Sequence, residues 1–373
     1  MGRRALCWLV PLWCVALKAR AEPDIRILLA ETERPVQLAG KDLLVSLDYS
    51  PPISVRRRRL QVRFGQEGME VVSGSKLVGK GQRLVAEADG AIGVGQGVYF
   101  GRIEIVTGRG HGRKSSEATV VNRIPMETYL LGIVGSEMPA SWPAAALEAQ
   151  AVAARTYALD RRLRMRGAGK PWDVRDSVLS QVYGGAESIL PSVVEAVGRT
   201  RGVVLAFEHV PAEALFHSTC GGRTRSAEEV FGGNVPYLVP RRCRWCRDSA
   251  RYRWDLSVPL SDLNELLEHA GLARGRVRRV SRRERAKRVT IDTTRGRHRL
   301  APQRLRAALG AGRVYSSDFV ARTRNRTLEM QGRGFGHQVG LCQWGARGMA
   351  EEGRDFHEIL AHYYPEVPLK RAY

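Results

Sequence analysis

Apolar and polar residues alternate along much of the chain between residues 24 and 121. The stretch Tyr99 to Ile105 repeats with a period of two, which predicts a half-buried β-strand. Short apolar runs separated by Gly, Pro and Ser predict further strands at IRILLAE, LLVSLDY, LQVRF, MEVVS, RLVAEA and ATVVN. We therefore expect a β-rich scaffold over this region.

The pattern changes to a helical one after residue 121. Pro125 has the fixed φ of a first helical turn and predicts a helix that runs to about residue 135. Ser141 is a good N-cap and Pro143 suits the first turn of a second, alanine-rich helix ending near residue 167. The small alanine side chains would let other elements approach this second helix closely.

Glu137 falls in the short connector between these two helices. Pro139 disfavours helical backbone at the residue before it, and Met138 and Trp142 supply apolar surroundings. A partly desolvated carboxyl has a raised pKa and keeps its proton near neutral pH, as a general acid must. A plain capping role for Glu137 and a surface role for Arg155 are the alternatives, and the spacing alone does not decide between them.

Helices are also predicted at 191–199, 260–270 and 303–309, with basic strands between the last two. The chain therefore has an α+β pattern, which we divide into five segments. They are a signal peptide (1–21), a β-rich scaffold (22–121), a region with the catalytic helices and a Cys/His group (122–254), a basic inserted β/α subdomain (255–315) and a C-terminal part (316–373). We expect an active-site cleft between the scaffold and the mixed region.

The first 21 residues have the three parts of a secretory signal: basic residues, an apolar core and the cleavage motif Ala19-Arg20-Ala21. The apolar run is shorter than the roughly 20 residues of a membrane span, so we expect an exported protein without a stable span after cleavage. Cleavage removes four basic residues and lowers the net charge from +22 to +18. Export argues against nucleic acid as the partner and favours a polyanionic envelope polymer, with a merely solvated basic surface as the alternative.

Four cysteines remain after the signal, and three of them stand near a histidine in an H-x2-C…C-x2-C arrangement. Two such pairs have the ligand spacing of a closed, structural zinc site, formed by His217, Cys220, Cys243 and Cys246. Disulfides are the alternative in an exported protein. Near the C-terminus, His357-Glu358 resembles the start of the H-E-x-x-H motif of zinc proteases. Ala361 occupies the place of the second histidine, so the motif is not complete.

Two signatures resemble one family. NRIPMETYLLGIVGSEMPASWPAAALEAQAVAARTY and GRGFGHQVGLCQWGARGMA are similar to the motifs of the stage II sporulation protein D (SpoIID) family, which includes the LytB amidase enhancers. Gln338 stands where the family has glycine, and Leu341 where it has methionine. The resemblance extends over nearly all of the mature chain, and the two signatures in this order are very specific.

The resemblance implies a peptidoglycan lytic transglycosylase with Glu137 as catalytic acid and Arg155 as its support. It also implies zinc near the cysteines, and glycan strands as the substrate. Polar residues in or near the signatures are the expected substrate contacts: Gln150, Ser177, Gln181, Tyr183, His337 and Gln343. The other function in the family is that of a non-catalytic enhancer that holds glycan and stimulates a cell-wall amidase. A structural histidine at position 337 and a plain turn at 176–185 are the alternatives for those contacts.

Overall fold

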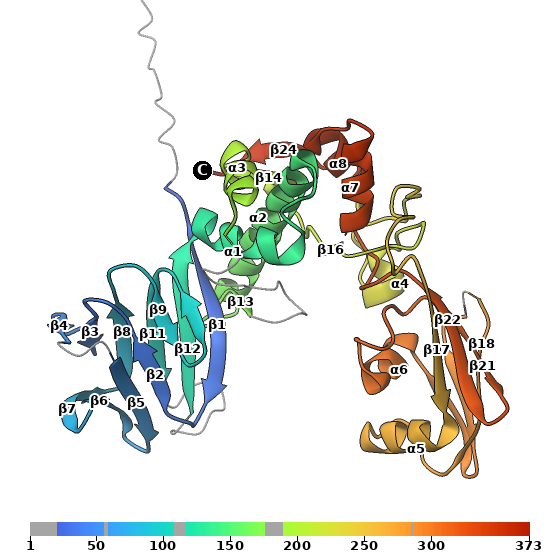
Figure 1. The fold of residues 1–373 in the computed structure, drawn as a ribbon, viewed down its shortest axis with the longest axis horizontal. Coiled ribbons are helices and arrows are strands. Elements are labelled where there is room, and N and C mark those ends of the chain that lie inside the picture. Colours follow the sequence, from blue (N-terminus) through green and yellow to red (C-terminus); the bar gives the residue numbers. More distant parts are fainter. Residues whose placement is uncertain (1–20, 56–58, 108–116, 176–188, 285) are drawn as a thin grey trace, which may run out of the picture.

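The computed structural model describes residues 21–55, 59–107, 117–175, 189–284 and 286–373. It has the expected α+β architecture, with a strand-rich N-terminal part, a central group of helices and a separate β/α subdomain. Figure 1 shows the helices lying above these two β-containing parts, which are well separated from each other. The predicted signal peptide, apart from its last residue Ala21, lies outside the described residues.

The N-terminal part consists of two sheets with a shared core of mainly aliphatic side chains. One sheet has the order β13-β1-β12-β11-β8-β3-β4 and the other β10-β9-β2-β5-β6-β7. Their bounds are β1 Asp24–Thr32, β2 Val36–Ala39, β3 Leu44–Leu47, β4 Ile53–Ser54, β5 Arg59–Gly65, β6 Gly68–Ser73, β7 Lys76–Gly81, β8 Arg83–Glu87, β9 Ile92–Val94, β10 Gly97–Tyr99, β11 Arg102–Thr107, β12 Ala118–Pro125 and β13 Val174–Arg175. The β-rich scaffold is thus present as expected.

The strand predicted across Tyr99–Ile105 is divided into β10 and β11. Gly101 causes the break, since it has a φ of +83° and passes so close to β12 that a Cβ would lie 2.4 Å from the Arg123 carbonyl oxygen. Only glycine tolerates both conditions at low cost. Alternation holds within β11, where Ile103 and Ile105 are buried.

The alanine-rich helix α2 (Ala144–Gly167) forms the centre of the helical part and is buried from Ala146 to Asp160. Because its side chains are small, other helices pack directly on it: α1 (Met126–Glu137), α3 (Pro191–Arg199), α7 (Gln343–Glu351) and α8 (Phe356–Tyr363). A small sheet of β14 (Val203–Phe207), β15 (Val210–Pro211) and β24 (Leu369–Arg371) completes this part.

Two details of the predicted helices differ. Helix α1 continues to Glu137, so this residue ends a helix and does not lie in a connector. Helix α2 begins after Pro143, whose position is the N-cap, and no side chain caps it; the expected capping by Ser141 is wrong. Both differences follow from the prolines, since Pro139 and Pro143 fix where helical backbone ends and resumes.

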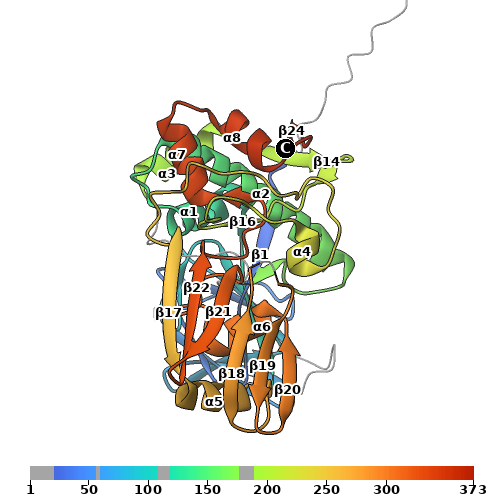
Figure 2. The same ribbon diagram turned by 90° about the vertical axis from the view of Figure 1, so that its right-hand side faces the viewer.

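The inserted subdomain is a six-stranded sheet with two helices on one face (Figures 1 and 2). The bounds are β17 Arg253–Pro259, α5 Leu260–His269, β18 Val277–Arg282, β19 Val289–Thr293, β20 Gly296–Leu300, α6 Pro302–Leu309, β21 Phe319–Arg324 and β22 Thr327–Arg333. The predicted boundary at residue 315 is therefore too early. β22 pairs with β17 along its whole length, and both belong to this subdomain.

After β22 the chain returns to the helical part through the glycine-rich segment. There β23 (Leu341–Cys342) pairs in parallel with β16 (Phe216–His217), and α4 (Ala227–Phe231) lies nearby in the same region. This pairing brings together segments that are more than 120 residues apart in sequence. It also sets the position of Gln343, the first residue of α7.

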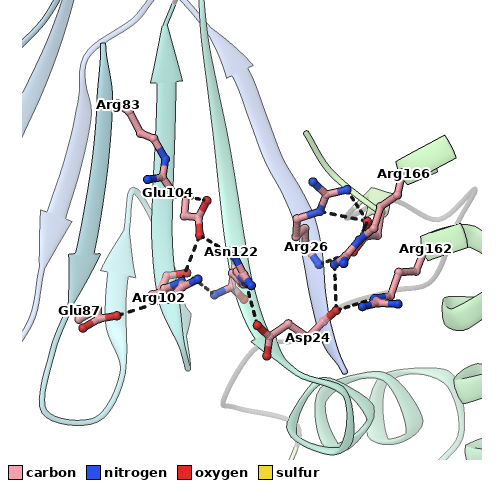
Figure 3. A network of polar contacts seen from close by, with 11 residues as sticks. Asp24, Arg26, Arg83, Glu87, Arg102, Glu104, Asn122, Arg162 and Arg166 are labelled. Atoms are coloured by element: carbon pink, nitrogen blue, oxygen red, sulfur yellow. Dashed lines mark hydrogen bonds and ion pairs between the residues drawn. The ribbon is translucent and has the colours of Figure 1, made fainter. Parts of the chain in front are cut away.

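Charged residues connect the N-terminal sheet to the end of α2 (Figure 3). The buried carboxylate of Asp173 accepts hydrogen bonds from Arg26 on β1 and from Arg166 on α2. Arg162 donates to the carbonyl of Asp24. Because both arginines neutralise it, the carboxylate can stay charged although it is buried. Removal of one arginine should therefore lower the free energy of unfolding. Within the described ranges, none of the helices has the length and apolarity needed to span a bilayer.

Candidate functional site

Glu137 lies at the C-terminal end of α1 and is half-buried. Its Oε2 accepts a hydrogen bond from Nε2 of Gln343 at 3.0 Å, although the two residues are 206 positions apart. The carboxyl group is thus held by a side chain from α7 while part of it is accessible to solvent.

Gln150 on α2 joins this pair. The side chain is fully buried, and its Oε1 lies 3.5 Å from Nε2 of Gln343. Its own Nε2 is buried and has no hydrogen-bond partner in the described part of the chain. A buried amide donor is expected to be bonded, so an unused one beside an accessible carboxyl indicates a place for a ligand atom. Three predicted residues, Glu137, Gln150 and Gln343, thus meet.

Two tryptophans next to these residues were not predicted as site residues. The rings of Trp142 and Trp344 pack edge to face with centroids 5.1 Å apart. The Arg347 guanidinium lies 5.5 Å from the Trp142 centroid and 4.9 Å from that of Trp344. Both rings are half-buried and therefore partly accessible. Their proximity in sequence to Glu137 and Gln343 was a signal that could have identified them.

Arg155 does not have the predicted role. Its guanidinium is fully buried and forms two hydrogen bonds with Glu127, at 3.0 and 2.7 Å. It also donates to the carbonyls of Val203 and Val197. The expectation that Arg155 supports Glu137 is corrected for a geometric reason: five residues along a helix amount to a rotation of about 140°, so Arg155 points away from the side that Gln150 occupies.

The partner of Arg155 is held by several groups. Glu127 also accepts hydrogen bonds from the Gly202 N–H and the Tyr373 hydroxyl. Burial opposes ionisation of Glu127, but the hydrogen bond and charge of Arg155, together with Tyr373 and Gly202, outweigh it and hold the pKa below its usual value. We therefore interpret this pair as structural.

His337 lies against the rings of His217 and Phe231, each with a centroid distance of 5.5 Å. Its Nδ1 accepts a hydrogen bond from the Val339 N–H. Burial lowers the pKa of His337 to about 4, and burial together with His337 lowers the pKa of His217 to about 3. Both imidazoles are therefore neutral at physiological pH. A contact between His337 and substrate stays a prediction.

Gln338, which replaces a family glycine, is accommodated in an unusual backbone conformation. It has a φ of +65°, a value that favours glycine, and is fully buried. Its Nε2 donates to the carbonyls of Cys220, at 2.9 Å, and Arg333, at 3.0 Å. These bonds offset the backbone strain, so the glycine-rich segment keeps its shape despite the replacement.

The four cysteines Cys220, Cys243, Cys246 and Cys342 form one buried cluster, and none is in a disulfide. Their sulfur atoms all lie within 4.8 Å of one another, and those of Cys220 and Cys246 are 3.5 Å apart. A tetrahedral zinc site with bonds of about 2.3 Å requires sulfur separations of about 3.8 Å. The predicted ligand set is therefore corrected at one position: Cys342 takes the place of His217.

The surroundings of the cluster fit a metal-bound thiolate group. The Sγ of Cys342 accepts hydrogen bonds from the Cys220 N–H at 3.2 Å and the Gly345 N–H at 3.3 Å, and it caps α7. Such bonds stabilise negative sulfur. Hydrogen bonds from Cys220 and from the other two thiols lower the pKa of Cys246, whereas the neighbouring thiols raise the pKa of Cys220, and burial together with those thiols raises that of Cys342. The four sulfurs therefore need a positive charge among them to be ionised together. A side chain at Gly345 would overlap Cys243, so α7 lies directly on the cluster.

His217 is not a member of the cluster: its Nδ1 is hydrogen-bonded to the Val339 carbonyl at 3.1 Å, and its buried Nε2 has no partner among the described residues. Glu358, of the pair His357-Glu358, forms a capping box with Asp355 at the start of α8. The predicted contacts Ser177, Gln181 and Tyr183 lie outside the described residues.

Comparison with known proteins is consistent with these motifs. Residues 114–207 match the family model described as SpoIID, stage II sporulation protein. The chain is 35% identical over 256 residues to an uncharacterised protein of Brachyspira hyodysenteriae, covering 67% of this chain and 68% of that protein. It is 31% identical over 266 residues to stage II sporulation protein D of Bacillus amyloliquefaciens, covering 68% and 76%.

A further relative is the amidase enhancer of Bacillus subtilis, 29% identical over 294 residues, which amount to 64% of this chain and 40% of the enhancer. The match to stage II sporulation protein D extends over three quarters of that protein. The chain therefore belongs to the SpoIID family.

Proposed function

We propose that this protein is an exported peptidoglycan lytic transglycosylase that cleaves the bond between N-acetylmuramic acid and N-acetylglucosamine in peptide-free glycan. The observation that carries the proposal is the contact of Glu137 with Gln343, beside the unpartnered amide of Gln150. Family membership supports a role at the cell wall, since the relatives are named for sporulation and for amidase enhancement. The signal-like N-terminus supports export.

Glu137 acts first as the acid. Its proton passes to the glycosidic oxygen, and the bond from that oxygen to the anomeric carbon of the muramic acid breaks. The resulting carboxylate then takes the proton of the C6 hydroxyl of the same muramic acid, whose oxygen bonds to the anomeric carbon. The product is a 1,6-anhydro end, and no water is consumed. Because the nucleophile belongs to the substrate, one carboxyl is sufficient, unlike the usual pair in glycosidases.

Gln343 decides which oxygen of Glu137 carries the proton. Since its amide N–H donates to Oε2, that oxygen is an acceptor, and the proton belongs on Oε1. Once the proton has left, the same N–H stabilises the carboxylate by a charge-assisted hydrogen bond, which is stronger than a neutral one. Gln150, with a free donor next to Gln343, is placed to bind a sugar oxygen or N-acetyl group.

Trp142 and Trp344 would contact the apolar faces of sugar rings on either side of the scissile bond. Half-buried indoles offer large, rigid surfaces at a low entropic cost. Arg347, which lies over both rings and is ion-paired with Glu351, keeps them in place. These residues would position the strand with its reacting oxygen at Glu137.

Zinc, if bound, would be held by the four cysteines and would serve structure. Four protein ligands leave no open position for water, and the site lies at the start of α7. Its contribution would be to hold Gln343, which directly follows Cys342, against Glu137.

The test is the Glu137→Gln variant incubated with purified peptide-free glycan strands. We expect a loss of anhydro-muramic ends of at least 1,000-fold, with circular dichroism and unfolding unchanged. Glu265→Gln, the same change at an exposed position on α5, is the matched control and should keep full activity. Release of anhydro ends by Glu137→Gln at the parental rate would refute the mechanism.

A non-catalytic enhancer is the second candidate, favoured by the similarity to the amidase enhancer. Such a protein would bind glycan and stimulate a cell-wall amidase without producing new chain ends itself. Incubation of the purified parental protein with glycan strands alone separates the two, because only the enzyme generates anhydro sugars.

A further inference from the structure

The sheet of the inserted subdomain has one face that no helix or strand of the described residues covers. Helices α5 and α6 pack on the other face, where Val280, Ile291 and Leu328 are fully buried. Figure 2 shows the open face toward the viewer, with β17, β22, β21, β18, β19 and β20 side by side and the helices behind them.

The open face carries polar side chains of two kinds. Register places Arg322 beside Glu329 on one side and Ser281 on the other, while Arg279 lies opposite Asp292. Further side chains of this face are arginines and neutral polar groups: Arg253, Ser257, Thr290, Arg297, Arg299, Arg324, Gln331 and Arg333. The excess of arginine over acids gives the face a net positive charge.

A hollow of about 470 Å³ lies in this face, within the size range of small-ligand pockets. Its two sides differ chemically. One side is lined by Arg279 of β18, Arg322 of β21, and Arg283, which directly follows β18. Strands β17 and β22 contribute the oxygen-bearing side chains of Asp255, Ser257, Glu329 and Gln331.

A further arginine, Arg282, is held by the fold on the other face of the sheet, where Phe319 and Ala321 are buried. Arg282 is 7% exposed, donates to the carbonyls of Ala286 and Phe319, and lies over the Phe319 ring at 4.7 Å. Burial lowers its pKa to about 10, so it stays charged at neutral pH. Arg279 and Arg283 are exposed, and neither forms an ion pair within 4.0 Å in the described residues. Their charges are therefore available to a ligand.

We propose that this hollow binds an acidic sugar of a peptide-free glycan strand, with the sugar carboxylate on the arginines and the hydroxyls on the opposite side. Guanidinium groups match carboxylates in charge and geometry. Asp255 and Glu329 accept hydrogen bonds from sugar hydroxyls, whereas they would repel a polymer charged at every unit, such as a polyphosphate. An uncharged glycan would leave the arginines without an anion.

The inference takes its ligand from the proposed function but does not depend on catalysis at Glu137. The hollow belongs to β17, β18, β21 and β22, while Glu137 contacts α7, so the two are separate sites. A strand bound at both would be held by two contacts, and the second would raise its effective concentration at the first. The same hollow would serve an enhancer equally well.

The test measures binding of purified peptide-free glycan strands by calorimetry, in the Glu137→Gln background so that no cleavage occurs. Arg279→Gln with Arg283→Gln should raise the Kd at least tenfold. Arg304→Gln with Arg313→Gln removes the same charge from exposed positions on or after α6 and should change the Kd less than twofold. Because binding is read without turnover, the result is independent of whether the protein is an enzyme.

Two further ligands identify the chemistry. Glycan whose lactyl carboxyls have been converted to methylamides should bind the parental protein as weakly as native glycan binds the double variant. Poly(glycerol phosphate) should not displace native glycan. Equal binding of native glycan by the double variant, equal binding of the amidated glycan, or displacement by poly(glycerol phosphate) would each overturn the proposal.

Discussion

Helix α1 carries two glutamates that have opposite surroundings. Glu127, in the first turn, is 7% exposed and binds Arg155, Gly202 and Tyr373. Glu137, the last residue, is half-buried and is held by an amide from α7. The first carboxylate is fully bonded within the fold, at the end of the helix that favours negative charge. The second retains access to solvent.

The comparison of Glu127 with Glu137 distinguishes a carboxyl that stabilises the fold from one that is proposed to react, within the same helix. A charge that is paired and buried contributes to folding and is not free to exchange a proton. A carboxyl that a neutral amide helps to position, with part of it accessible to solvent, is suited to exchanging a proton. The arginine of the family signature thus belongs with the first glutamate, and changes at the two sites should have different consequences.

The largest effect is expected at the cysteine cluster, which positions α7 and therefore Gln343. Cys342→Ser should abolish stoichiometric zinc binding, lower the unfolding free energy by more than about 4 kcal/mol and reduce activity. Metal content by mass spectrometry and denaturant unfolding provide the readouts. Purified parental protein with less than one zinc per chain and two disulfides would contradict the metal assignment.

Arg155→Met tests the structural side of the comparison. It leaves Glu127 buried without its cationic partner, which should lower the unfolding free energy by about 3–5 kcal/mol. Glu137→Gln should change it by less than about 1 kcal/mol. Urea titrations of both variants give the values. A stable Arg155→Met protein with lost activity would restore the catalytic role for this arginine.

Gln343→Leu tests the contact on the reactive side. Loss of a hydrogen bond to a charged group costs about 1.5–3 kcal/mol, so we expect kcat to fall about 10- to 100-fold while the protein stays folded. Gln343→Glu would place a second carboxyl beside Glu137 and should shift the pH optimum upward. Unchanged kcat and pH profile in both variants would show that Gln343 does not act on Glu137.

The smallest effect is the pH dependence of the Glu127 pair. Its pKa is lower in the folded protein than the unfolded value of about 4.5, so the stabilisation is present above that pH and is lost as the pH falls through the folded value. The difference in unfolding free energy between the parental protein and Glu127→Gln should therefore narrow below pH 4.5. A difference that is constant down to pH 3 would contradict the pairing.

Local patterns in the sequence predicted most of the elements. Prolines and periodicity placed α3 over residues 191–199 and α2 to its end near residue 167, as observed. Alternation predicts a strand but does not show which sheet the strand joins. Residues 319–333 could belong to the inserted subdomain or to the C-terminal part, and the pairing of β22 with β17 assigns them to the inserted subdomain.

Most residues of the site could be predicted from the sequence, but which of them contact one another could not. Glu137, Gln150 and Gln343 were singled out from motifs, and they meet. The local spacing of His217 and Cys220 favoured a histidine ligand, but the pairing of β16 with β23 brings Cys342 into the cluster from 122 residues away. Motif membership alone does not show that Arg155 pairs with Glu127, because this depends on the rotation of about 140° between positions 150 and 155 of α2.

The central claim is that Glu137 transfers protons while the muramic C6 hydroxyl, and not water, attacks. Digestion of peptide-free glycan by the parental protein in H₂¹⁸O, followed by mass spectrometry of the ends, tests this most directly. We predict 1,6-anhydro ends that contain no ¹⁸O and that are absent from the Glu137→Gln reaction. Reducing ends labelled with ¹⁸O would show hydrolysis, and an absence of new ends would show that the parental protein only binds the strand; either result would contradict the account.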